Sequence, residues 1–155
     1  MTVLLGVFLL QVEPDELWCV SDGTTSHSYD LSGPELRAVL NSPVIFAERL
    51  KRPLTGFPGM FWCASHTGVR VTLANGNLWL VHKGNNFGIS SQTVVVAARH
   101  MSNAWEVFEK KDLDGTKTVS DFVAVGGTMY DVWDDNCHDA SQAMMDNNSP
   151  RCPPP

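Results

Sequence analysis

The chain has 155 residues, which is enough for one domain with a single core. Its 43% hydrophobic content, with five Trp and seven Phe, argues against a disordered chain. The net charge is −6 and the basic residues are scattered, so the chain lacks the positive surface with which proteins bind nucleic acids.

The N-terminal segment, residues 1–20, has two interpretations. Residues 3–10 form an apolar run of the length found in signal peptides, which would make the protein secreted. No Lys or Arg precedes the run, however, and residues 11–17 are acidic where a cleavage site would stand. The alternative is a buried first strand, which fits a cytoplasmic protein. The run is shorter than the roughly 20 residues that cross a bilayer, so we expect no transmembrane segment.

A short helix and a loop are predicted next. Pro34 and Glu35 are typical of a first helical turn, and Pro43 is typical of a position beyond the end of a helix, so we expect about two helical turns between them. Residues 52–59 contain two Pro and two Gly, a composition that indicates a loop.

A β-hairpin is the clearest local signal. Apolar and polar residues alternate from Val69 to Leu73, Asn75-Gly76 is a typical turn, and residues 78–82 return as the second strand. With a two-residue turn, His82 would lie opposite Val69, and His66 would lie about three positions away along the ribbon. A bulge or a longer turn would bring the two imidazoles level. Residues 93–97 predict a third strand and residues 105–108 a fourth.

Two helices are predicted in the last third of the chain. Thr118 and Asp121 have the spacing of a capping box, and Gly126-Gly127 ends that helix. Residues 129–134 form an extended lead-in, after which Asn136 caps a helix that begins at Cys137. Residues 148–155 are rich in proline and should be irregular. The expected architecture is a single α+β domain over residues 1–155, with helices packed on a small antiparallel sheet.

The cysteines do not indicate a metal site. The four cysteines contain no CxxC pair and no zinc-like spacing, so we expect neither a metal nor another cofactor. In an oxidising compartment Cys19 can pair with Cys63, or Cys137 with Cys152, and the sequence does not choose between bridged and free thiols.

Cys137 is the candidate nucleophile. A helix N-terminus stabilises a thiolate and presents N–H groups that bind an oxyanion. Three acids lie close in sequence and act against a thiolate, namely Asp134, Asp135 and Asp139. A cationic partner is therefore needed, and histidine is the usual one.

Five histidines compete for the role of base: His27, His66, His82, His100 and His138. His138 is adjacent to Cys137, and neighbours on a helix point about 100° apart, so it is poorly placed. His27 and His100 lie in polar stretches without further features. We choose His66, at the mouth of a strand, with His82 as the group that orients it.

Two motifs, in this order, resemble the circularly permuted papain-like thiol hydrolases. The first is the strand His66-Thr67-Gly68-Val69, and the second is the segment from Tyr130 to Asn136-Cys137-His138, with the match covering about residues 61–147. The lecithin:retinol acyltransferase-like branch has a second histidine about one hairpin later, as His82 is here. The PPPDE-like peptidases have an HTG strand and an Asn-Cys segment, and NlpC-like enzymes share the fold. His138-Asp139-Ala140 differs from the residues that these branches carry after the cysteine, which leaves the substrate class open.

This resemblance implies a cysteine-dependent hydrolase or acyltransferase that acts on an ester, thioester or amide. Cys137 would attack, His66 would be the base, His82 would orient His66, and Asn136 and Tyr130 would support the oxyanion. The substrate would be an acyl compound or a peptide, including a lipid, and the oligomeric state is left open. The alternative is a catalytically inactive, secreted binding protein with the same fold and disulfide-bonded cysteines.

Overall fold

The computed structural model describes residue 31 and residues 33–53, 65–83, 93–129 and 135–146. The predictions for residues 1–20, for most of the loop at 52–59, for most of the lead-in at 129–134 and for the tail at 148–155 fall outside this described part.

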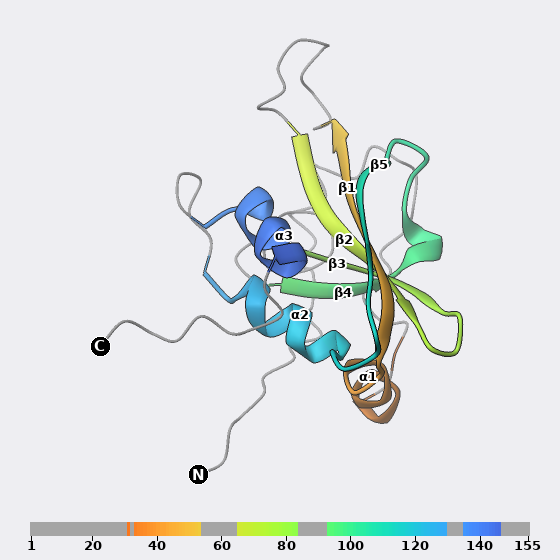
Figure 1. The fold of residues 1–155 in the computed structure, drawn as a ribbon. Coiled ribbons are helices and arrows are strands. Elements are labelled where there is room, and N and C mark those ends of the chain that lie inside the picture. Colours follow the sequence, from red (N-terminus) through yellow and green to blue (C-terminus); the bar gives the residue numbers. More distant parts are fainter. Residues whose placement is uncertain (1–30, 32, 54–64, 84–92, 130–134, 147–155) are drawn as a thin grey trace.

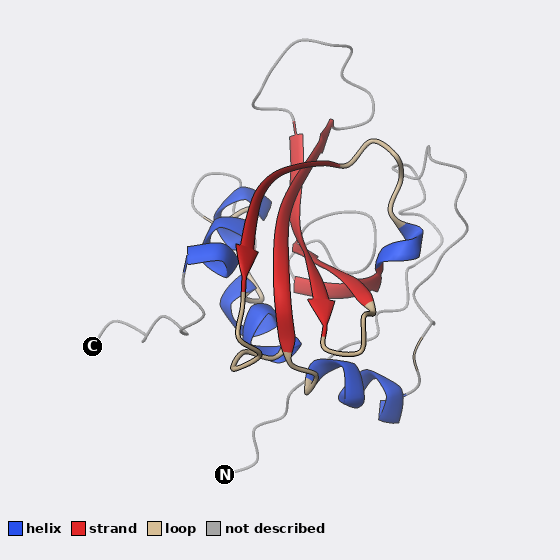
Figure 2. Ribbon diagram, turned by 45° about the vertical axis from the view of Figure 1, so that its right-hand side comes forward, coloured by secondary structure: helices blue, strands red, loops and turns tan. Residues whose placement is uncertain are grey.

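The described strands form one antiparallel sheet in the order β4-β3-β2-β1-β5. Their bounds are β1 (Val44–Pro53), β2 (Ser65–Leu73), β3 (Leu78–Lys83), β4 (Thr93–Ala97) and β5 (Glu106–Asp112). The helices are α1 (Gly33–Leu40), α2 (Val119–Gly126) and α3 (Cys137–Asp146), with a short 3-10 turn, η2 (Ala98–His100). Figure 1 shows α2 and α3 on the same side of the sheet, and Figure 2 shows the same arrangement from a second direction. The prediction of an α+β fold with helices on a small antiparallel sheet is confirmed.

The local signals placed most of these elements correctly. The Thr118 backbone N–H donates to the Asp121 carboxylate at 2.8 Å, so the first turn of α2 is capped as its sequence predicts. The Asn136 side-chain oxygen accepts the N–H of His138 at 2.8 Å, which begins α3 at Cys137. None of the described helices is long and apolar enough to cross a membrane.

The hairpin turn is longer than the two-residue turn considered from the sequence. The N–H of Leu73 donates to the carbonyl of Asn77 at 2.9 Å, and the N–H of Gly76 donates to the carbonyl of Leu73 at 2.8 Å. Gly76 has a φ of 83°, a left-handed conformation that suits glycine. This is a turn closed by a glycine bulge. It shifts the register by one residue, so that His82 lies opposite Gly68 and not opposite Val69.

The strand β1 is absent from the sequence-based prediction, and the fourth predicted strand was too short. β1 lies between β2 and β5 and pairs with both. Arg49 lies opposite Glu109 and the next residue, Leu50, lies opposite Val107, so Phe108 is an extra residue in β5. That irregularity is a β-bulge on a strand at the edge of the described sheet.

Alternating side chains give the sheet two different faces. We call the side covered by α2 and α3 the helix face; its core includes Val69, Val71 and Val81, which pack with residues of α2 and α3. We call the other side the far face, where Leu50 and Leu80 are also buried but belong to no part of that core. Residues opposite one another on antiparallel strands share a face, so these assignments follow from the register.

Candidate functional site

Two imidazoles meet on the far face. Nε2 of His66 lies 2.9 Å from Nδ1 of His82, and the two rings are nearly perpendicular, with centroids 5.1 Å apart. His66 lies two positions before Gly68, the register partner of His82, so the histidines are diagonal neighbours on the same face. The structure thus joins the two histidines that the sequence singled out.

The absence of a side chain at Gly68 makes room for this pair. A Cβ built on Gly68 would lie 2.9 Å from Cβ of His82 and 3.0 Å from Cδ1 of Leu80. Those separations are shorter than van der Waals contact, so a larger residue would push His82 away from the sheet. Gly68 therefore leaves the space that His82 needs to stay within hydrogen-bonding distance of His66.

A cation and an indole complete the surroundings of the pair. Arg52 lies opposite His66 on β1, and its guanidinium lies over the ring of Trp105 at 5.4 Å. The Trp105 ring is also 5.5 Å from the His66 ring. His66, His82 and Arg52 are all buried, so charge on either imidazole is disfavoured.

Both pKa values shift in the direction that this burial predicts. Burial lowers the pKa of His82 to about 3, with a further lowering by the Arg52 cation. The pKa of His66 lies well below its usual 6.5, mainly because of burial and then because of His82, Arg52 and His138. Near neutral pH both rings are therefore neutral, and one donates a hydrogen bond to the other.

Cys137 begins α3 on the helix face. Its thiol is free and buried in the structure, and Cys152, the partner considered from the sequence, lies outside the described residues. It lies on the same side of α3 as Ala140 and Met144, which belong to the core of the helix face. Asn136 has the capping role that its sequence position predicts.

The histidine pair and Cys137 lie at the same end of β2 but on opposite faces. Nε2 of His138 lies 2.9 Å from the carbonyl oxygen of Ser65, which places the first turn of α3 beside the start of β2. Thr67 points to the helix face, where its hydroxyl meets Ser141, and His66 alternates with it. Tyr130, the other predicted supporting residue, lies outside the described residues.

Two buried cations near Cys137 were not singled out from the sequence. Lys83 is fully buried on the helix face and donates to the Asp135 carboxylate at 2.5 Å. Arg49 extends from β1 to the carbonyl of His138 at 3.0 Å. No local signal indicated them, because Arg49 lies in a charged stretch and Lys83 ends a strand whose residues are buried on both faces.

Nothing in the described residues suggests a metal centre, since no three His, Cys, Asp or Glu side chains there are grouped to hold an ion. Comparisons of this chain with protein-family models, with curated proteins and with solved structures find no match.

Proposed function

We propose that this protein is a cysteine-dependent hydrolase or acyltransferase of the permuted papain-like type. The observation that carries the proposal is the 2.9 Å contact between His66 and His82 at the strand end where α3 begins. A thiol enzyme needs a base held in one orientation by a third group. The histidine pair supplies that base and that third group.

The ring atoms suit this division of roles. Nε2 of His66 contacts Nδ1 of His82, which leaves Nδ1 of His66 on the other side of the ring from this contact. When Nε2–H of His66 donates to His82, Nδ1 of His66 carries no proton and is the ring nitrogen that can accept one from a thiol. Contacts between nucleophile and base are often long without substrate, and closing this one requires His66 to reach the Cys137 thiol around the end of β2, where the first turn of α3 is held in place.

The reaction would follow the chemistry of other thiol enzymes. The sulfur of Cys137 attacks the carbonyl carbon of an ester, thioester or amide, and its proton passes to His66. N–H groups at the start of α3 bind the oxyanion, with Asn136 holding that turn and Tyr130 as a further support. His66 then protonates the leaving group. Water or a second nucleophile attacks the resulting thioester, releases the acyl group and restores the thiol.

A second candidate is an inactive binding protein with the same fold. The observation that favours it is the location of Cys137 and His66 on opposite faces of β2. In that case the buried thiol is part of the core, and the histidine pair is part of the packing of the far face. The protein would then bind an acyl compound or a peptide without turnover.

The test is alkylation of each cysteine by iodoacetamide between about pH 4 and 9, read by mass spectrometry on the native protein. If His66 acts as the base for Cys137, we expect His66→Gln to slow the alkylation of Cys137 about tenfold near neutrality, where the His66 ring is neutral. His100→Gln is the matched control, because η2 lies outside the proposed site.

A parallel assay with p-nitrophenyl acetate measures whether Cys137 becomes acetylated and whether the acetyl group is then released. Acetylation that disappears in both Cys137→Ser and His66→Gln supports the enzyme. Equal alkylation profiles in the parent and His66→Gln, together with no acetylation, would leave the inactive binding protein as the correct description.

A further inference from the structure

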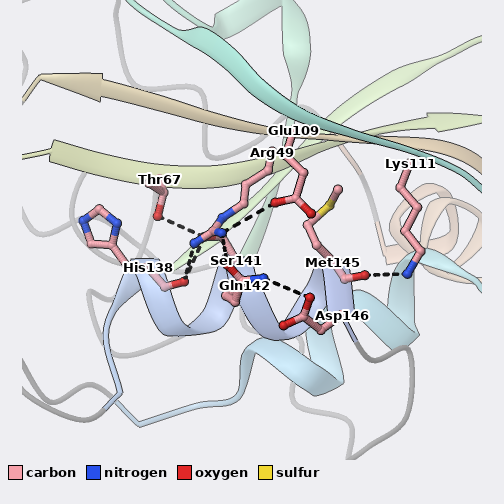
Figure 3. A network of polar contacts seen from close by, with 9 residues as sticks. All are labelled: Arg49, Thr67, Glu109, Lys111, His138, Ser141, Gln142, Met145 and Asp146. Atoms are coloured by element: carbon pink, nitrogen blue, oxygen red, sulfur yellow. Dashed lines mark hydrogen bonds and ion pairs between the residues drawn. The ribbon is translucent and has the colours of Figure 1, made fainter.

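One buried guanidinium, that of Arg49, contacts the first two turns of α3 at several points. Nε of Arg49 donates to the hydroxyl of Ser141 at 3.0 Å, and Nη2 donates to the carbonyl of His138 at 3.0 Å. Nη1 donates to the side-chain oxygen of Gln142. Figure 3 shows these contacts converging on Arg49 from one side of the helix. One residue of β1 therefore contacts three residues of α3.

Arg49 is itself fixed from the neighbouring strand. The Glu109 carboxylate of β5 lies 3.6 Å from Nη1, and the ring of Phe108 lies 5.1 Å from the centre of the guanidinium. A planar guanidinium held on several sides loses little further freedom when it binds a carbonyl. Arg49 is a rigid support for the carbonyl of His138.

Lys83 provides a second contact from the other side of β2. Its ammonium is fully buried and lies 2.5 Å from the carboxylate of Asp135, whose side chain is 42% exposed. A buried ammonium costs several kcal/mol unless it is paired, so this ion pair constrains Asp135 strongly. A Cβ on Gly127, at the end of α2, would lie 3.7 Å from the same ammonium. Lys83 thus lies where α2 ends and α3 begins.

The two cations bracket Cys137 in the sequence and in space. Asp135, two residues before Cys137, is held by Lys83 from β3, and His138, the residue after it, is held by Arg49 from β1. Because β2 lies between β1 and β3, the two contacts come from opposite sides of the strand beneath α3. The backbone that carries the thiol has little freedom to move.

We infer that Arg49 and Lys83 are positioning residues, which together fix the Cys137 thiol at the start of α3. The catalytic purpose of this arrangement depends on the function proposed above. The effect of the two cations on the accessibility of the Cys137 thiol can be measured without any substrate.

The experiment compares Arg49→Met and Lys83→Met with Lys111→Met in the full chain. Lys111 is the matched control, because its ammonium donates to the carbonyl of Met145 at 2.5 Å and anchors the other end of α3 (Figure 3). We expect Arg49→Met and Lys83→Met to raise the alkylation rate of Cys137 about tenfold, since local opening of the first turn exposes the buried thiol. Acetylation by p-nitrophenyl acetate should fall in the same two variants. A general loosening of the protein would raise both rates.

Alkylation rates within about twofold of Lys111→Met would overturn the inference, as would a parallel rise in amide exchange at Phe122 in α2, which reports global opening. If Lys83→Met does not fold, Asp135→Ala removes the same contact from a half-exposed side chain, and the same rise is expected. If the parent protein is not acetylated at all, the proposed function fails, and the alkylation rates still decide whether the two cations position the thiol.

Discussion

The two faces of the sheet bury charge-bearing residues in different ways. On the helix face, Arg49 and Lys83 are buried cations, and each contacts a carboxylate, from Glu109 and Asp135 respectively. On the far face, His66 and His82 are buried as neutral rings, and their pKa values are lowered mainly by burial. The first set is thus paired with carboxylates, whereas the second set stays neutral until the pH falls well below the ordinary pKa of histidine.

Because of this difference, we expect the two faces to be destabilised by different changes. The helix face depends on close packing between α2, α3 and the strands, so it should be most sensitive to added volume. The far face depends on two groups that titrate near neutrality when the chain unfolds, so it should be most sensitive to acid. A substitution that disturbs the contacts of one face should leave the contacts of the other face unchanged, so that the second face provides an internal reference.

Acid gives the largest expected effect, and it acts on the far face. Unfolded histidines take up a proton near pH 6.5, whereas the folded pKa of His82 is about 3, so the unfolded chain binds more protons between these values. This contribution to stability is complete above pH 6.5 and falls as the pH drops. With His66 shifted in the same direction, the loss should approach roughly 3 kcal/mol per pH unit. Urea unfolding at a series of pH values measures it.

A His82→Gln variant provides the control for this prediction. Because the variant has one titrating group fewer, its free energy of unfolding should change with pH about half as steeply between roughly pH 6 and 4. A variant with the same slope as the parent would show that carboxylates, and not the histidine pair, govern the acid sensitivity.

Gly126→Ala should give the next largest effect, on the helix face. A Cβ there would lie 2.3 Å from the hydroxyl of Thr93 and 2.6 Å from Cε of Met144. Thr93 is part of β4 and Met144 is part of the core, so relief requires both elements to move. We expect a loss of about 3 kcal/mol, which outweighs the roughly 1 kcal/mol that alanine gains in helix propensity. Thermal melting tests this, and an unchanged melting temperature would contradict the close packing of α2.

Gly68→Ala should have a smaller effect, on the far face alone. The new Cβ pushes against Cβ of His82, so we expect a loss of about 2 kcal/mol and separation of the two imidazoles. NMR of the ring nitrogens measures the separation directly. Retention of the coupling between His66 and His82 would show that the strands adjust without moving the pair.

The sequence predicted elements whose signals are local. The caps at Thr118 and Asn136 and the helix between Pro34 and Pro43 depend on residues within one or two turns, and all of them appear in the structure. The hairpin was predicted as well, but its register was not, because an Asn-Gly pair fits turns of more than one length.

The strand β1 could not be recognised in the same way. Its sequence, VIFAERLKRP, carries four charged residues within five positions from Glu48 to Arg52, which argues against a buried strand by local criteria. The charges are compensated by distant partners: Glu48 by Arg70 at 2.5 Å and by Lys110, and Arg49 by Glu109. Only the tertiary structure brings these partners together.

The candidate site was predicted in parts. The two histidines and the free cysteine were singled out, and the structure joins the histidines. Side-chain alternation decides which face each residue occupies, and a one-residue change in turn length reverses that choice. The faces of His66 and His82 relative to α3 were therefore beyond what the sequence could indicate.

The bulge at Phe108 has a consequence for behaviour at high protein concentration. β5 is at the edge of the described sheet, and an open edge offers unpaired backbone groups to a strand from another molecule. The extra residue disrupts the spacing of those groups, and the strand EVFEKKD presents charged side chains along the rest of the edge. A strand from a second copy of the protein would therefore have to pair with a bent and charged edge at β5. This side of the molecule is thereby protected against edge-to-edge aggregation.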